Sequence, residues 1–192
     1  MMNLPNKLTL LRIVLVPFFV FFLLAGGGGA FNLTALLVFA VASLTDTLDG
    51  KIARSRGLIT TFGKLMDPLA DKILVMSAMI CFVALGLAPA WVVILILTRE
   101  FLVTSLRLIA AGEGRVIAAD KWGKIKTVTQ MIWIIWALLW LWLASSPSAF
   151  PAGFDAFPHI ITSILMYASV FFTLLSGFNY VWKNRALVFS DM

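Results

Sequence analysis

The sequence predicts an all-α polytopic membrane protein with six transmembrane helices, a short N-terminal interfacial helix and both termini in the cytoplasm. Of its 192 residues, 61% are hydrophobic and only 12% are charged, and the mean hydropathy is +1.01. Soluble domains are about 45–50% apolar and about 25% charged, so a water-soluble globule is excluded. A disordered chain is excluded too, because it needs low hydrophobicity and high charge. At about 20 residues for each span, this length holds six spans with short connections.

Residues that favour turns separate six apolar stretches. Before the first stretch, Pro5 to Arg12 alternates polar and apolar residues at helical spacing, which predicts the interfacial helix. A secretory signal peptide is the alternative for this end of the chain, but Gly26–Gly29 matches a cleavage site poorly. The expected spans are 10–25, 31–52, 65–87, 91–111, 128–144 and 160–182.

The positive charges predict the orientation of the bundle. Lys and Arg are absent from three connections: Gly26–Gly29, Gly86–Pro89 and Ser145–Pro158. Because Lys and Arg concentrate on the cytoplasmic side of membrane proteins, the opposite side is the cytoplasmic one. The basic residues on that side are Lys7, Arg12, Lys51, Arg54, Arg56, Lys64, Arg115, Lys121, Lys124, Lys126, Lys183 and Arg185.

Acidic residues gather in one part of the chain. The chain has nine Asp and Glu residues, and four of them lie within 26 positions, in or beside apolar stretches. Residues three or four apart share a helix face. Asp46 and Asp49 therefore predict one carboxylate stripe, and Asp67 and Asp71 predict a second stripe on the next span.

These carboxylates predict a divalent-metal site. A charged side chain costs about 2.5–3.5 kcal/mol at the bilayer centre, and neighbouring carboxylates repel one another. Divalent cations relieve both costs, and oxygen ligands without Cys or His select Mg²⁺ or Mn²⁺ over Zn²⁺. Gly50 and Ala53 lie on the face of the first stripe, where small residues let a bulky ligand approach the backbone.

Two alternatives compete with a metal site. The carboxylates could serve as the ion site of an ion-coupled transporter, although the discontinuous helices and repeats usual in such transporters are not evident. They could also be neutralised by nearby basic side chains, namely Lys51, Arg54, Lys64 and Lys72.

The spacing of these residues resembles the signature of the CDP-alcohol phosphatidyltransferases. The sequence reads Asp46-x-x-Asp49-Gly50-x-x-Ala53-Arg54 and, after eight intervening residues, Gly63-x-x-x-Asp67-x-x-x-Asp71, without departure from the family pattern. The six-span arrangement is also similar to that of the family. We therefore expect residues 1–192 to form one membrane domain of this family.

The resemblance implies transfer of a phosphatidyl group from CDP-diacylglycerol to an alcohol, with release of CMP. It also implies a homodimer and two divalent ions, Mg²⁺ or Mn²⁺, in each active site. Two metals suit an in-line displacement at phosphorus because they stabilise both the attacking and the leaving oxygen. By resemblance, Asp71 is both a metal ligand and the general base. The other metal ligands are Asp46, Asp49 and Asp67, and the CDP-binding residues are Gly50, Ala53, Arg54 and Thr61.

A second basic group predicts an anionic acceptor. Arg99 lies inside an apolar run, where an unpaired guanidinium is costly, and Arg107 lies two turns later on a similar helix face. Lys124 and Lys126 follow at the cytoplasmic start of the fifth span. We expect these four residues to bind the acceptor's phosphate. Pairing of Arg99 with Glu100 or with a motif carboxylate is the alternative.

Other cations near the inner surface have a simpler interpretation. Arg115 and Lys121 are expected to attract anionic lipid head groups. A choline or ethanolamine acceptor would instead need acidic residues or an aromatic cage.

Further segments resemble the branch of the family whose acceptor is sn-glycerol 3-phosphate and whose product is phosphatidylglycerophosphate. This branch implies that the C1 hydroxyl of the acceptor lies near Asp71 and that Asn6, Thr9 and Thr61 line the nucleotide end. Inositol phosphate and phosphatidylglycerol also need a cationic pocket and remain alternative acceptors. The segments are Pro5-Asn6-Lys7-Leu8-Thr9, Phe62-Gly63 with Asp67-Pro68, Arg99-Glu100-Phe101 and Gly123-Lys124-Ile125-Lys126-Thr127.

These features together predict an integral protein of the bacterial inner membrane with its active site facing the cytoplasm. The expected partners are CDP-diacylglycerol, sn-glycerol 3-phosphate, the lipid bilayer and a second copy of the chain. No nucleic-acid partner is expected, because the net charge of +6 is explained by orientation of the bundle and by substrate phosphates.

Overall fold

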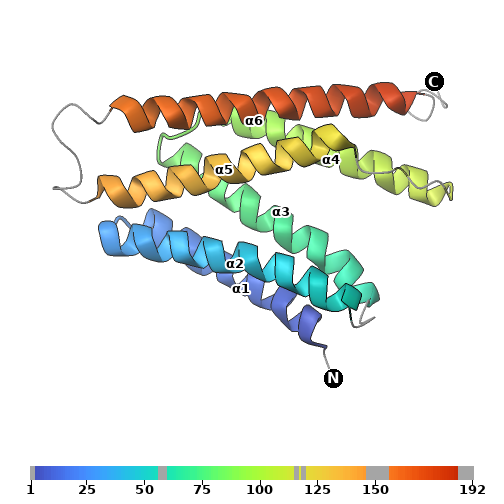
Figure 1. Cartoon of the computed structure of the whole chain (residues 1–192), viewed down its shortest axis with the longest axis horizontal. Coiled ribbons are helices and arrows are strands. Elements are labelled where there is room, and N and C mark those ends of the chain that lie inside the picture. The colour runs from blue at the N-terminus through green and yellow to red at the C-terminus, as the bar shows by residue number, and fades with distance from the viewer. Residues whose placement is uncertain (1–2, 56–59, 115–116, 118–119, 146–155, 186–192) are drawn as a thin grey trace. The chain divides into compact units, whose positions relative to one another are not determined.

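The computed structural model describes the backbone of residues 3–55, 60–114, 117, 120–145 and 156–185; within these ranges the side chains of 47–55, 61, 64, 65 and 156 lie outside the description. These ranges contain six α-helices and no strand, so the all-helical prediction is confirmed (Figure 1). The helices are α1 (Leu4–Leu24), α2 (Gly29–Ser55), α3 (Thr61–Ala84), α4 (Ala90–Gly112), α5 (Lys121–Ala144) and α6 (Ala156–Lys183).

Most helices extend beyond the apolar stretches from which they were predicted. α5 begins seven residues before the expected start of the span at 128, and α3 begins at Thr61 rather than at 65. The start of α3 is set by its cap: Thr60 Oγ1 accepts a hydrogen bond from the backbone N–H of Gly63 at 3.0 Å. Hydropathy predicts where lipid begins, whereas capping decides where a helix begins.

α1 joins the predicted interfacial helix and first span into one continuous helix. Asn3 caps it by accepting from the N–H of Asn6 at 3.1 Å, and Pro5 lies in the first turn, where a missing N–H costs nothing. No break separates the two predicted parts. One buried stripe runs along the whole helix: Pro5, Asn6, Thr9, Arg12, Val16, Phe19 and Leu23.

The chain divides into two compact units. The first comprises Met1–Leu87 and Ile134–Phe154, and the second comprises Ala88–Trp133 and Asp155–Met192, so that α5 contributes to both. In the first unit α1 packs against α2 and α3. In the second unit α4 packs against α6.

Apolar and small side chains fill the core of each unit. In the first unit, Phe19 of α1 lies against Phe39 of α2 with ring centroids 5.5 Å apart, and both rings are fully buried. Near the N-terminal end of α2, Asn32 Nδ2 donates to the carbonyl oxygen of Leu141 in α5 at 3.1 Å. In the second unit, Val103 and Leu106 of α4 pack against Tyr180 of α6.

The outward faces are apolar as well. Leu108 and Phe178 are each 69% exposed, and Phe101 is 61% exposed. Among the described residues, α1, Gly29–Asp46 of α2, α5 and Phe157–Lys183 of α6 are long and apolar enough to cross a membrane. In α3 and α4 charged residues interrupt the apolar stretch: Asp67, Asp71 and Lys72 in α3, and Arg99, Glu100 and Arg107 in α4. An apolar exterior of this extent needs lipid around it, and the chain is an integral membrane protein.

Candidate active site

Two of the predicted carboxylates, Asp46 of α2 and Asp67 of α3, contact the polar part of α1. Asn6, Thr9 and Arg12 follow one another at three-residue spacing, which places them on one face of the helix. Thr9 and Arg12 are fully buried and Asn6 is 8% exposed. A buried polar side chain needs a partner, and these three find theirs on α2, on α3 and at the cap of α3.

Asp46 of α2 pairs with Arg12. The distance from Arg12 Nη1 to Asp46 Oδ1 is 2.8 Å, and Arg12 Nε donates to the carbonyl oxygen of Ala42 at 3.1 Å. The Asp46 side chain remains 43% exposed. Asp46 is therefore held through one oxygen while much of its side chain stays accessible.

Asp67 of α3 is bound by Thr9. The Thr9 hydroxyl donates to Asp67 Oδ1 at 2.5 Å, and Asp67 is half-buried. Asp71 lies one turn later on α3 and is exposed. The two predicted carboxylates Asp46 and Asp67 thus contact the same short section of α1, although they come from different helices.

The start of α3 is tightly packed against α1. Thr60 Oγ1 donates to Asn6 Oδ1 at 3.0 Å. A Cβ atom at Gly63 would lie 3.2 Å from Asn6 Oδ1, 3.3 Å from Thr60 Oγ1 and 3.6 Å from Asp67 Oδ2. Glycine therefore favours the close approach of α3 to α1 at this position, because a larger residue would crowd these atoms.

The remaining predicted residues of the carboxylate group lie outside the described side chains. The backbone of α2 includes Asp49, Gly50, Ala53 and Arg54, and α3 begins at Thr61. Their side-chain contacts belong to the part of the chain that the structure does not describe, so their roles stay predictions.

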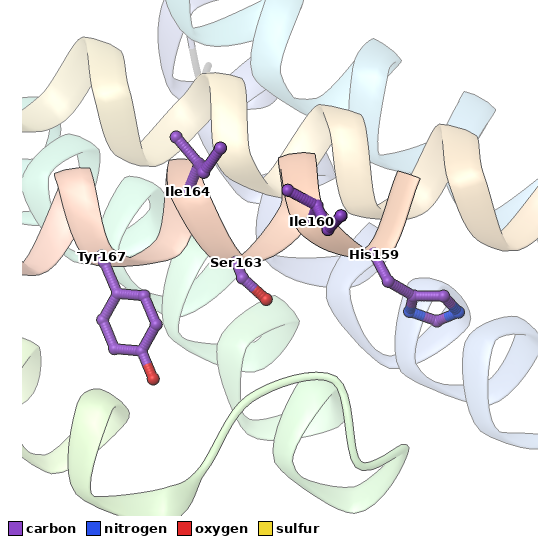
Figure 2. A pocket seen from close by; sticks show the side chains of 5 residues that line it. All are labelled: His159, Ile160, Ser163, Ile164 and Tyr167. Carbon is purple, nitrogen blue, oxygen red and sulfur yellow. The ribbon is translucent and has the colours of Figure 1, made fainter. Parts of the chain in front are cut away.

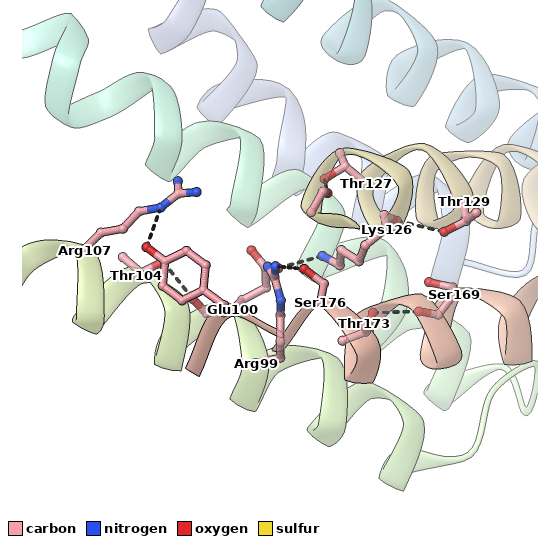
Figure 3. Close-up of polar contacts among 12 residues, drawn as sticks. Arg99, Glu100, Thr104, Arg107, Lys126, Thr127, Thr129, Ser169, Thr173 and Ser176 are labelled. Carbon is pink, nitrogen blue, oxygen red and sulfur yellow. Dashed lines mark hydrogen bonds and ion pairs between the residues drawn. The ribbon is translucent and has the colours of Figure 1, made fainter. Parts of the chain in front are cut away.

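The predicted phosphate-binding cations lie in the second unit. Figure 3 shows Arg99 and Glu100 of α4, Lys126 of α5 and Ser176 of α6 converging on one another. Glu100 Oε1 lies 2.8 Å from Arg99 Nη1 and 2.7 Å from Lys126 Nζ. Arg99 Nη2 donates to the Ser176 hydroxyl at 2.5 Å. The alternative partner named for Arg99, Glu100, is therefore in contact with it, and the same carboxylate also binds Lys126.

Small residues let Arg99 lie between α5 and α6. A Cβ atom at Gly177 would lie 3.1 Å from Arg99 Cγ, and one at Gly123 would lie 3.6 Å from Arg99 Nη2. Lys126 is only 4% exposed. The two cations are thus held in place by close packing as well as by their shared carboxylate.

Arg107 and Lys124 are placed differently from Arg99 and Lys126. Arg107 Nε donates to Tyr180 Oη at 3.3 Å, and its guanidinium carbon lies 5.7 Å from the centre of that ring. Arg107 and Lys124 are exposed. Of the two residues assigned to lipid head groups, Lys121 is exposed and Arg115 lies outside the described residues.

Asp120 joins the start of α5 to the end of α6. Its carboxylate accepts from Lys183 Nζ at 3.2 Å and from Asn179 Nδ2. Burial acts to raise the pKa of Asp120, but the hydrogen bonds from Lys183 and Asn179 and the charge of Lys183 outweigh it and lower the pKa. Asp120 is therefore ionised at neutral pH and stabilises this end of the second unit.

The structure also has an apolar hollow of about 510 Å³ along α6, lined by His159, Ile160, Ser163, Ile164 and Tyr167 (Figure 2). Neither a carboxylate nor a Lys or Arg side chain lines it. It lacks the chemistry of either predicted site.

A family model described as CDP-alcohol phosphatidyltransferase matches residues 2–175. The chain belongs to the CDP-alcohol phosphatidyltransferase family. This membership confirms the prediction made from the spacing of the carboxylates.

Relatives with curated names are similar over nearly the whole chain. The CDP-diacylglycerol–glycerol-3-phosphate 3-phosphatidyltransferase of Bacillus subtilis is 44% identical over 96% of both chains. A probable phosphatidylglycerophosphate synthase of Mycobacterium tuberculosis is 42% identical over 93% of this chain and 80% of its own. The CDP-diacylglycerol–glycerol-3-phosphate 3-phosphatidyltransferase of Rickettsia typhi is 37% identical over 94% of this chain and 96% of its own.

CDP-alcohol phosphatidyltransferases use divalent metal ions, and the donor atoms here fit such ions. The described donors near α1 are the carboxylates of Asp46 and Asp67, with Asp71 one turn beyond. Oxygen donors of this kind suit Mg²⁺ or Mn²⁺. Among the side chains that the structure describes, no three acidic, His or Cys residues form a complete set of ligands; Asp49 lies outside them.

Sequence reasoning missed three residues that hold the predicted ones in place. Arg12 was assigned to membrane orientation, and Ser176 and Tyr180 were not singled out. A signal exists for the last two: Ser169, Thr173, Ser176 and Tyr180 recur at three- and four-residue spacing in an apolar helix and are all buried. Such a stripe in a transmembrane helix is typical of a helix-packing face.

Proposed function

We propose that the chain transfers the phosphatidyl group of CDP-diacylglycerol to sn-glycerol 3-phosphate, giving phosphatidylglycerophosphate and CMP. The observation that carries this proposal is the 44% identity, over 96% of both chains, to the Bacillus subtilis enzyme of that name. The acceptor follows from that name, and the cations of α4 and α5 are suited to its phosphate.

The carboxylates of α2 and α3 hold two divalent ions, Mg²⁺ or Mn²⁺, in this proposal. When bound, such ions supply positive charge that neutralises the diphosphate and the charge developing at phosphorus. Asp71 takes the proton of the acceptor hydroxyl. The metal ligands are Asp46, Asp49, Asp67 and Asp71.

The CDP moiety binds along the end of α2. Gly50 and Ala53 are small enough for the nucleotide to approach the helix backbone, and Arg54 pairs with the diphosphate. Thr61, at the start of α3, contributes a hydroxyl to the same site. A guanidinium suits a diphosphate because it can donate two parallel hydrogen bonds.

The phosphate of sn-glycerol 3-phosphate binds to Arg99, Arg107, Lys124 and Lys126. Arg99 and Lys126 together carry one more positive charge than their partner Glu100, so an anion is attracted to the cluster. Ser176 and Tyr180 orient the two arginines, which reduces the entropy lost when the phosphate binds.

In the membrane, we propose six spans, with the N-terminal part of α1 at the inner interface and both termini in the cytoplasm. α3 and α4 are spans whose charges belong to the two sites. The active site faces the cytoplasm of a bacterial inner membrane, where water-soluble sn-glycerol 3-phosphate meets a lipid substrate. The enzyme is a homodimer, and the whole chain is one functional domain.

An acceptor-exchange assay tests the function. Purified protein in detergent micelles with CDP-diacylglycerol should release CMP only when sn-glycerol 3-phosphate and Mg²⁺ or Mn²⁺ are both present, and a chelator should stop the reaction. If inositol phosphate or phosphatidylglycerol supports turnover and sn-glycerol 3-phosphate does not, the assignment of the acceptor is wrong. Solute flux into proteoliposomes without CMP release would instead favour a transporter.

A further inference from the structure

Arg12 is a fully buried cation at the point where the polar part of α1 gives way to its apolar part. Its side chain is 0% exposed, and α1 is long and apolar enough to span a membrane. A cation that only orients the bundle would extend to the lipid head groups, since long basic side chains reach toward the interface. Arg12 instead points into the first unit, so its charge serves a partner inside the protein.

Two contacts of Arg12 with α2 differ in kind. Nε donates to the carbonyl oxygen of Ala42, a fully buried residue of α2, at 3.1 Å. Nη1 lies 2.8 Å from Asp46 Oδ1, one helical turn further along α2. Because the guanidinium is planar and rigid, the contact with Ala42 fixes the direction in which the second arm meets the carboxylate.

We infer that Arg12 is a positioning residue that fixes the carboxylate of Asp46 for metal binding. This inference rests on the proposed function, in which Asp46 is a metal ligand. The side chain of Asp46 is 43% exposed, so the contact with Arg12 leaves it accessible to an ion. When a group that hydrogen-bonds to a metal-ligating side chain is removed, metal affinity typically falls about 10–100-fold.

Two substitutions of Arg12 distinguish an effect of its geometry from an effect of its charge. Lysine would keep the positive charge at this position, but a single ammonium group cannot reproduce the rigid fork that contacts both Ala42 and Asp46. If Arg12 acts by geometry, Arg12→Lys should resemble Arg12→Gln. If Arg12 acts only through its charge, Arg12→Lys should resemble the wild type.

The experiment measures Mn²⁺ binding by the full-length protein in detergent micelles. Mn²⁺ binding is read directly by electron paramagnetic resonance and again as the rise of Tm with Mn²⁺ concentration, since a ligand of the native state stabilises it. Arg12→Gln and Arg12→Lys should each weaken Mn²⁺ binding at least about 10-fold, while the KM for sn-glycerol 3-phosphate changes less than about twofold. In an Asp46→Asn background, Arg12→Gln should weaken Mn²⁺ binding no further.

Asn32→Ala is the matched control. Asn32 makes polar contacts at the opposite end of α2 in the same unit, with Leu141 and with Ser145 Oγ at 2.6 Å. This variant should lower Tm without weakening Mn²⁺ binding, which separates general destabilisation from positioning. If Arg12→Gln fails to fold, Arg12→Lys carries the test alone.

Two results would overturn the inference. In the first, Arg12→Lys binds Mn²⁺ as tightly as the wild type or more tightly, while Asp46→Asn binds it more weakly. Arg12 is then not a positioning residue, and the proposed function stands. Unchanged Mn²⁺ binding in Asp46→Asn removes Asp46 from the metal site and, with it, the inference.

Discussion

Glu100 shows how a single carboxylate can organise a cationic site. It lies within 2.8 Å of Arg99 and within 2.7 Å of Lys126, and its own side chain is only 18% exposed. Two cations so close together would repel each other in an apolar setting, where charge is poorly screened. With Glu100 between them they can be held together and still leave a net positive charge for a phosphate.

Lys126→Ala should raise the KM for sn-glycerol 3-phosphate about 10–100-fold, because a hydrogen bond to a charged group contributes about 1.5–3 kcal/mol. Glu100 keeps Arg99 as its partner in this variant. The KM for CDP-diacylglycerol should change less than threefold in steady-state assays of CMP release. Lys183→Ala, which removes an exposed lysine of the same unit, is the control. Equal changes in both KM values would remove Lys126 from the acceptor site.

At the scale of the secondary-structure element, α1 has one buried face whose chemistry changes along its length. Asn6, Thr9 and Arg12 form the polar part, and Val16 and Phe19 continue the same face with apolar side chains. The polar part contacts Asp46 of α2, Asp67 of α3 and the α3 cap, while the apolar part packs in the core. The segment predicted to form an interfacial helix, Pro5 to Arg12, therefore contacts Asp46 and Asp67 with its buried face.

Gly63→Ala tests how tightly α3 is packed against α1. The added methyl group would meet Asn6 Oδ1 at 3.2 Å and Thr60 Oγ1 at 3.3 Å, and these two atoms are already hydrogen-bonded to each other. We expect a loss of about 1–3 kcal/mol of stability from overpacking and slower CMP release, because Asp67 lies beside the same position. Thermal unfolding in detergent micelles measures the first effect.

Gly112→Ala provides the control for Gly63→Ala. A Cβ atom at Gly112, in the last turn of α4, would meet nothing within 4 Å. Since alanine favours a helix over glycine by up to about 1 kcal/mol, this variant should be neutral or slightly stabilising. If Tm falls by a similar amount in both variants, the tight packing at Gly63 makes no specific contribution to stability.

At the scale of the whole molecule, the chain combines an apolar exterior with buried polar sites. Side chains such as Leu44, Ile94 and Phe171 are at least 60% exposed, whereas Arg12 and Thr9 are fully buried. Such an apolar exterior over an apolar core is unlike the surface of a soluble protein and requires a lipid environment. The lack of Lys and Arg in three connections predicts how the bundle is oriented in that environment.

The orientation can be tested with two cysteine variants in a Cys81→Ala background. Ala90→Cys marks the start of α4, and Arg185→Cys marks the residues after α6; both positions are exposed. In spheroplasts, a membrane-impermeant maleimide should label the Ala90→Cys protein at once and the Arg185→Cys protein only after the membrane is permeabilised. The reverse pattern would contradict the cytoplasmic placement of the C-terminus.

Composition and hydropathy predicted the helical fold and the membrane setting, and the resemblance of one motif to a family signature predicted the family. Asp46, Asp49, Asp67 and Asp71 recur at the three- and four-residue spacing of a helix, which allowed the sequence to predict their shared faces. The pairing of Arg99 with Glu100 was foreseen as an alternative, because neighbouring opposite charges in an apolar run have few other partners. The part played by Lys126 in the same cluster depends on how α4 and α5 pack and could not be read from spacing.

The chemically special residues, four carboxylates and a small set of cations, can be recognised from the sequence because the rest of the chain is apolar. Which side chains hold them depends on how the helices pack. Arg12 is one of two basic residues near the N-terminus until α1 packs against α2, and Thr9, expected at the nucleotide end, is seen to bind Asp67 only when α3 brings that carboxylate within 2.5 Å. The physical reason is that local spacing sets the face of a helix, whereas burial and partners depend on contacts between residues far apart in the chain.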